Sequence, residues 1–225
     1  MININETFEE RKGEIEFYYS VLVEIDRESS SIQTIDNARL FRIMKSNFIL
    51  MLYNLVESTV STGMLEIYES IRNDSCTYKT VVQELQKIWR DAKVRQVYSS
   101  STELKAYTNK VKEIVDDITT SAPFVLEKGM LNINGNLNAG RIKHICDDHK
   151  IRYRVVDDDN KLEEVRKKRN SLAHGDESFS QCARDLTLSD LESIKDIIIR
   201  FLGGIIQGME NYCDNKQYLI ANSTS

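Results

Sequence analysis

Apolar residues recur every three or four positions through most of this chain, separated by abundant Lys, Glu and Arg. Near the N-terminus, for example, Phe8, Ile15, Leu22 and Ile25 follow this spacing. A helix places such residues on one face, where they pack against neighbouring helices. The pattern predicts helices over about 6–28, 36–72, 78–95, 102–118, 139–149, 161–174 and 189–215. We therefore expect an all-α helical bundle.

The stretch Phe48–Tyr53 is apolar on all sides of its predicted helix, which is typical of the central, most buried helix of a bundle. It is also the longest apolar run, and six residues cannot span a bilayer. The first residues lack the basic start and apolar core of a secretion signal. We therefore expect a cytoplasmic protein with no membrane partner.

Residues 124–159 interrupt the helical pattern. Asn and Gly crowd positions 132–138, Ile151–Val155 alternates like a short strand, and Asp157–Asp159 is predicted to be a solvated turn. A chain of 225 residues that is 41% hydrophobic can form one domain with a sizeable core. We therefore expect a single domain over 1–225, with a small loop-rich insertion at 124–159.

Short signals mark the ends of the last two predicted helices. Gly175 suits the position just after a helix, and Ser189–Glu192 fits a capping box at the start of the final helix. Gly204 and Gly208 lie four residues apart inside that helix. They would let another backbone approach closely, from the same bundle or from a second subunit.

The formal net charge of −5 disfavours a broad electrostatic grip on a polyanion. Any binding of nucleic acid must therefore depend on a local group of cations. Arg166, Lys167 and Lys168 form such a group, and they are the candidate substrate-binding residues.

Metal or cofactor binding is not indicated. The four cysteines form no C-x-x-C pair, which argues against a zinc knuckle and favours free thiols. His144 and Asp148 would share a helix face, but His149 would not join them. A solvated polar helix is the simpler interpretation, so we expect no metal and no cofactor.

The segment around Arg169 carries the candidate chemistry. Leu162, Val165, Arg169 and Leu172 are spaced by three, four and three residues, so Arg169 occupies a position on an apolar stripe. A guanidinium there is costly unless it is paired or lines a cleft. His174 follows five positions later, which places it off that face of a continuous helix. Either the helix breaks at His174, or the two groups meet across a symmetric dimer.

Arg169, Asn170 and His174 together suit the cleavage of RNA without a metal. Imidazole can take up or release a proton near neutral pH, the guanidinium fork matches phosphate oxygens, and Asn can orient either partner. The 2′-hydroxyl would attack the adjacent phosphorus while Arg169 stabilises the charged transition state. The products would be a 2′,3′-cyclic phosphate and a 5′-hydroxyl.

Structural interpretations of the same residues stay open. Arg169 could form a buried ion pair, and His174 could cap the helix C-terminus, where a cation is favoured. Glu57 could contact Arg169 or form an ordinary salt bridge elsewhere. Trp89 and Tyr98 could stack on RNA bases, although single aromatics at helical spacing are more often core residues.

The arrangement Arg169-Asn170-x-x-x-His174 before a long final helix resembles the signature of the HEPN superfamily. Residues 48–58, 135–139 and 186–218 also look similar to the stand-alone bacterial HEPN nucleases of the MAE type. The resemblance implies a HEPN-like bundle that dimerises into a composite active site. It also implies that Arg169 and His174 are catalytic, with Asn170 as a supporting polar residue.

The leading hypothesis is a metal-independent endoribonuclease in a bacterial defence or toxin–antitoxin system, with an antitoxin or a neighbouring defence protein as a further partner. The alternative is a non-catalytic helical interaction module that partners another defence protein or a nucleotidyltransferase. A nucleotide-binding regulator is a third possibility, suggested only by some HEPN relatives.

Overall fold

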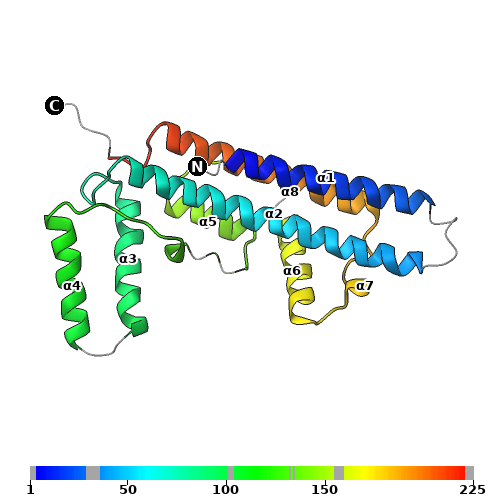
Figure 1. The fold of residues 1–225 in the computed structure, drawn as a ribbon, viewed down its shortest axis with the longest axis horizontal. Helices are drawn as coiled ribbons and strands as arrows, with labels where there is room; N and C mark the ends of the chain where they lie inside the picture. Colours follow the sequence, from blue (N-terminus) through cyan, green and yellow to red (C-terminus); the bar gives the residue numbers. More distant parts are fainter. Residues whose placement is uncertain are drawn as a thin grey trace. The chain divides into compact units, whose positions relative to one another are not determined.

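The computed structural model describes residues 4–28, 36–100, 104–131, 133, 135–154 and 160–220. The predicted all-α fold is confirmed, because every regular element in these residues is a helix (Figure 1). In chain order they are α1 Ile4–Glu28, α2 Asn37–Asn73, α3 Gln83–Ser100, α4 Leu104–Thr119, the 3-10 helix η1 Lys128–Met130, α5 Ala139–Asp148, α6 Asn160–His174, α7 Phe179–Cys182 and α8 Leu188–Asp214.

Two local predictions were wrong. Residues 151–154 form neither helix nor strand, whereas a strand was expected over Ile151–Val155. The third helix begins at Gln83 rather than near residue 78. The backbone just before it makes a hydrogen bond outside the helix, because the Val82 N–H donates to the Tyr218 carbonyl at 2.9 Å. The expected turn at Asp157–Asp159 lies outside the described residues, as do Asn132 and Asn134.

The chain divides into two compact units. Unit 1 comprises Met1–Thr62, Ile133–Ile142 and Arg154–Ile206, and unit 2 comprises Gly63–Asn132, Lys143–Tyr153 and Gln207–Ser225. The sequence predicted one domain with an insertion at 124–159. Residues of that insertion belong to both units, so it is not a separate appendage of either one.

In unit 1, α1 runs alongside the first part of α2 and of α8 (Figure 1). The Tyr18 hydroxyl donates to the Met44 carbonyl at 3.3 Å, and the Tyr18 ring stacks on Phe48 with 6.2 Å between centroids. Phe48 and Ile198 are fully buried. The apolar stretch around Phe48 therefore lies in the core, as its pattern predicted.

Helix α8 begins with a capping box, but not at the predicted residues. The Thr187 N–H donates to the Asp190 carboxylate at 2.8 Å, and the Asp190 N–H donates to the Thr187 hydroxyl at 3.1 Å. The cap was expected at Ser189. Thr187 and Asp190 have the same three-residue spacing, and Leu188 already lies in the helix.

The glycines of α8 make room for a backbone segment of the same chain. A Cβ on Gly204 would lie 2.7 Å from the Arg154 carbonyl oxygen in unit 1, and a Cβ on Gly208 would overlap the Arg152 carbonyl in unit 2. The open question about these glycines is thereby answered: the close neighbour belongs to the same chain.

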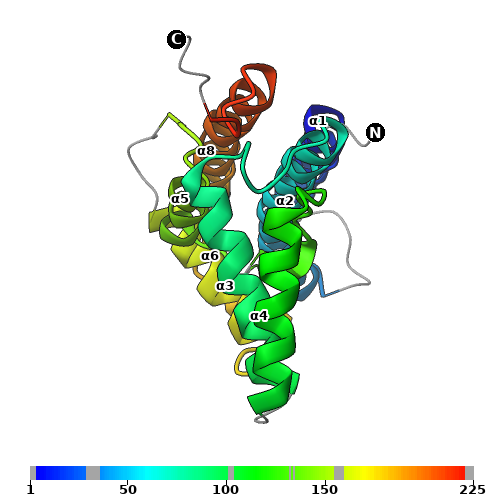
Figure 2. The same ribbon diagram turned by 90° about the vertical axis from the view of Figure 1, so that its left-hand side faces the viewer.

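Unit 2 contains a helical hairpin of α3 and α4, which lie side by side in antiparallel directions (Figure 2). The Lys93 ammonium bridges them through Glu113 at 2.9 Å and Asp117 at 3.2 Å. Trp89 is 4% exposed and packs against Phe124, so it is a core residue. The side chain of Tyr98 lies outside the described residues.

Helix α2 is long and apolar enough, by length and composition alone, to cross a membrane. However, 56% of its most apolar window is buried inside the protein. A core helix of a soluble bundle passes the same test, so the length of α2 is weak evidence for a membrane span.

Candidate active site

Helix α6 carries the predicted Arg–Asn–His segment and continues without a break to His174. It ends there because Gly175 adopts a left-handed φ of +76°. The Asp176 N–H then donates back to the Ser171 carbonyl at 2.9 Å, an arrangement typical of helix C-termini. Gly175 therefore has its predicted place just after the helix.

Arg169 is held by four groups in unit 1. Its Nη1 donates to the Gly135 carbonyl at 3.1 Å and to Asn170 Oδ1 at 3.0 Å. Its guanidinium carbon lies 4.7 Å from the centre of the Tyr53 ring, and Nη2 lies 3.9 Å from a carboxylate oxygen of Glu57. The charge on the apolar stripe is therefore paired, and 28% of the side chain remains exposed.

Tyr53 connects these groups through its hydroxyl. The hydroxyl accepts a hydrogen bond from the Leu137 N–H at 3.1 Å and donates to Glu57 at 3.3 Å. Burial, followed by the charge of Glu57, raises the pKa of Tyr53. The hydroxyl thus keeps its proton near neutral pH, and the ring supports the guanidinium as a neutral aromatic face.

Residues 135–138, which we call the GNLN loop, lie against one face of α6. The Asn136 side-chain oxygen accepts hydrogen bonds from Asn170 at 3.0 Å and from Arg166 at 3.4 Å. The Asn138 amide donates to Glu163 at 2.9 Å. The segment that the sequence predicted to be an insertion therefore forms one wall around Arg169.

Glu163 forms a two-pronged ion pair with Arg166. Two nitrogens of Arg166 reach its carboxylate at 2.9 and 2.6 Å. These hydrogen bonds, together with the one from Asn138, lower the pKa of Glu163 to about 2. Glu163 is therefore ionised at any physiological pH.

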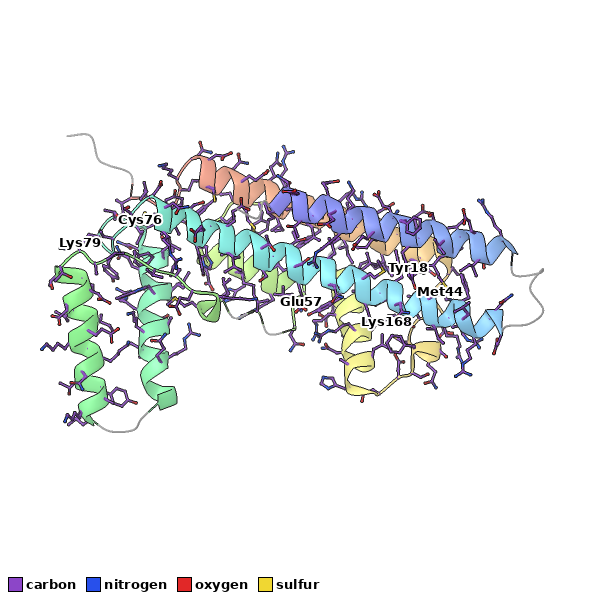
Figure 3. The ribbon with its side chains drawn as sticks, in the orientation of Figure 1. Tyr18, Met44, Glu57, Cys76, Lys79 and Lys168 are labelled. Carbon is purple, nitrogen blue, oxygen red and sulfur yellow. The ribbon has the colours of Figure 1, made fainter. Side chains whose placement is uncertain are left out.

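Two of the three predicted substrate-binding cations have partners within the protein. Arg166 binds Glu163 and Asn136, as described above. Lys168 donates to the Cys182 carbonyl at 2.7 Å, and Figure 3 shows it on the α7 side of α6. The Lys167 side chain is 70% exposed and lies 3.7 Å from Glu163. Of the three, Lys167 is the most accessible to a substrate.

His174 is exposed at the end of α6. Within the described part of the chain, its ring makes no hydrogen bond and no ion pair. Because α6 is continuous, five residues turn His174 about 140° away from Arg169 around the helix axis. Arg169 and Asn170 are in contact, whereas His174 points away from both within one chain.

Several residues around Arg169 were assigned no role at the site from the sequence, although residues 48–58 and 135–139 were part of the resemblance to HEPN nucleases. They are Tyr53, Gly135, Asn136, Asn138 and Glu163. The contact with Glu57 was considered as one of two alternatives, and the structure supports it. The accumulation of Asn around Gly135 indicated turns, but no local pattern relates residue 135 to residue 169. Only the fold brings them together.

The described residues contain no group of three or more His, Cys, Asp or Glu side chains that could hold a metal ion. His144 and Asp148 instead form an exposed ion pair on α5 at 3.4 Å. His149 is buried in unit 2, where its Nε2 lies 2.9 Å from the Tyr68 hydroxyl. The three residues therefore do not converge on one point.

An all-helical chain with Arg–Asn–x–x–x–His at the end of a helix, followed by a long final helix, has the features of a HEPN protein. The family model HEPN_MAE_28990/-like HEPN matches residues 2–218, so the chain belongs to this HEPN family. HEPN domains are commonly ribonucleases. No curated protein and no solved structure matches the chain.

Proposed function

We propose that this protein is a metal-independent endoribonuclease, acting in a bacterial defence or toxin–antitoxin system. The observation that supports it most is the state of the Arg169 guanidinium. Both hydrogens of Nη1 are used within the protein. Among the described residues, Nε and Nη2 make no hydrogen bond. A phosphate can therefore accept two parallel hydrogen bonds from this edge.

The proposed reaction needs one proton acceptor and one fixed cation. His174 takes the proton of the 2′-hydroxyl, whose oxygen forms a bond to the adjacent phosphorus. The bond from phosphorus to the 5′-oxygen breaks, and that oxygen takes up a proton from water, while the protonated His174 returns its proton to solvent. Arg169 stabilises the negative charge on the non-bridging oxygens in the transition state. The RNA fragments end in a 2′,3′-cyclic phosphate and a 5′-hydroxyl.

A homodimer is part of this proposal. His174 lies about 140° around α6 from Arg169, so the two side chains of one helix cannot readily hold the same phosphate. His174 is exposed and can reach a site on a second copy. A composite site would then combine Arg169 of one subunit with His174 of the other.

Removal of the imidazole tests the reaction. Purified wild-type protein is expected to cleave single-stranded RNA in the presence of EDTA, and His174→Ala is expected to abolish cleavage. His174 is exposed and makes no described contact, so the variant should unfold at the same temperature as wild type. Cleavage that survives in a folded His174→Ala protein would refute the proposal.

Mixing two inactive variants tests the composite site. In an equal mixture of Arg169→Ala and His174→Ala subunits, roughly half of the dimers are mixed. Each mixed dimer keeps one Arg169 and one His174 on different subunits, so activity should return. A mixture as inactive as its components would contradict a site shared between subunits, provided that subunit exchange is verified.

A second candidate is the non-catalytic interaction module. Helix α4 favours it, because Leu104, Val111 and Val115 expose 82%, 60% and 50% of their surface. These residues recur at helical spacing on the hairpin of unit 2. A protein that is inert on varied RNAs but co-purifies with a neighbour-encoded protein would support this function instead.

A further inference from the structure

We propose that the GNLN loop is a positioning element for Arg169, fixing which edge of its guanidinium meets the phosphate. This inference rests on the proposed nuclease function, because positioning Arg169 matters only if Arg169 binds the phosphate. The immobilisation of the Arg169 guanidinium by the loop can be measured without RNA. Gly135 provides the backbone carbonyl that binds Nη1. Asn136 holds Asn170, which is the other acceptor of Nη1.

The two acceptors of Nη1 determine the orientation of the guanidinium. A planar guanidinium with both Nη1 hydrogens engaged cannot rotate about its Cζ–Nη1 bond without losing them. Its face is fixed as well, by the Tyr53 ring at 4.7 Å. What remains is the edge formed by Nε and Nη2, the fork that suits two oxygens of one phosphate. The loop therefore selects the reactive edge.

Gly135 is required at its position for two separate reasons. Its φ of +66° is strained for other residues. In addition, a Cβ there would lie 3.2 Å from Nη2 and 3.5 Å from Nη1 of Arg169. Any side chain at residue 135 would press on the guanidinium itself.

The rest of the loop is anchored on three elements, so Gly135 cannot easily move aside. Leu137 is 1% exposed and its N–H donates to Tyr53 on α2. The Asn138 side chain accepts a hydrogen bond from the Arg141 N–H at 2.8 Å, which caps the start of α5, and it donates to Glu163 on α6. A displacement of the loop would break the cap and both attachments.

The experiment combines Gly135→Ala with a readout that does not depend on RNA. In wild type, NMR of the arginine side chains should show separate Nη signals for Arg169, because rotation of its guanidinium is slow. In Gly135→Ala these signals should average. The variant's kcat for RNA should fall by about 10- to 100-fold, as expected when a catalytic group is misplaced by about 1 Å.

Asn136→Ala provides a second variant that should fold, because Asn136 is exposed. We expect a smaller fall in kcat than in Gly135→Ala, and partial averaging of the Arg169 Nη signals. Two controls separate positioning from general damage. Gly129→Ala meets nothing within 4 Å and should leave kcat and the NMR signals unchanged. Gly175→Ala has a similar left-handed φ with nothing within 4 Å, and it serves only to measure the stability cost of that strain.

The outcomes are distinguishable. Gly135→Ala with wild-type kcat, or with a lower kcat but unchanged slow rotation of the guanidinium, would overturn the positioning role. If wild type itself cleaves no RNA, the nuclease proposal fails. In that case the NMR comparison alone decides whether the loop holds Arg169.

Discussion

Glu163 shows how one carboxyl connects the GNLN loop to the stability of unit 1. Its pKa of about 2, held down first by Arg166 and then by Asn138, lies below the value of about 4.3 expected in the unfolded chain. Stability from this group is therefore fully present above the unfolded pKa. This stabilisation is lost as the pH falls through the pKa of Glu163 in the folded protein.

We expect the free energy of unfolding of wild type to fall more steeply between about pH 5 and pH 2 than that of Glu163→Gln. The difference should be modest, because 32% of the Glu163 side chain is exposed and solvent screens the pair. Urea denaturation at several pH values measures it. Parallel curves for the two proteins would show that the ion pair contributes nothing in solution.

Arg169 shows which features of a site can be predicted from neighbouring residues in the sequence and which cannot. Its position on the stripe with Leu162 and Val165 predicted a guanidinium that is paired or lines a cleft. In the structure the guanidinium pairs with Glu57, and 28% of the side chain is exposed. The residues that contact the Arg169 guanidinium could not be predicted from helical spacing. Gly135 is 34 residues away, and helical periodicity carries no information over that separation because it describes only one element at a time.

At the scale of elements, the three glycines of α8 lie in the same helix but have different surroundings. Gly203 is exposed and a Cβ there would meet nothing within 4 Å. Gly203→Ala should therefore raise the free energy of unfolding by about 1 kcal/mol, through helix propensity alone. Gly204→Ala and Gly208→Ala gain the same propensity, but their Cβ atoms meet the backbone of residues 152–154.

We expect each of those two substitutions to destabilise the protein by about 1–3 kcal/mol, as overpacking does. Chemical denaturation of the three variants measures the contrast. If all three were equally stabilising, the backbone of residues 152–154 would not lie against α8 in solution.

Most helices were predictable because amphipathic periodicity persists over many residues, as it does in α1, α2 and α8. The short α7 was not predicted, since a helix of four residues has no periodicity to detect. The capping residue of α8 was placed two residues late, at Ser189 rather than Thr187. Thr187-x-x-Asp190 and Ser189-x-x-Glu192 both fit a capping box, and only the hydrogen bonds distinguish them.

At the scale of the whole molecule, charge constrains how an acidic protein can hold RNA. The formal net charge is −5, and two of the three cations beside Arg169 are bound within the protein. Arg169 and the exposed Lys167 remain for phosphate contacts. Each phosphate neutralised on a single strand contributes about −0.7 to the slope of log K against log salt.

Two contacts therefore predict a slope of about −1.4 for one chain, and four contacts predict about −2.8 for a dimer that uses both copies. The folded but inactive His174→Ala protein allows this measurement, because its RNA stays intact during titration at several salt concentrations. Lys167→Ala should reduce the slope by about 0.7 per chain, whereas Lys168→Ala should leave it unchanged. A slope steeper than about −5 would require a basic surface that neither the composition nor unit 1 provides.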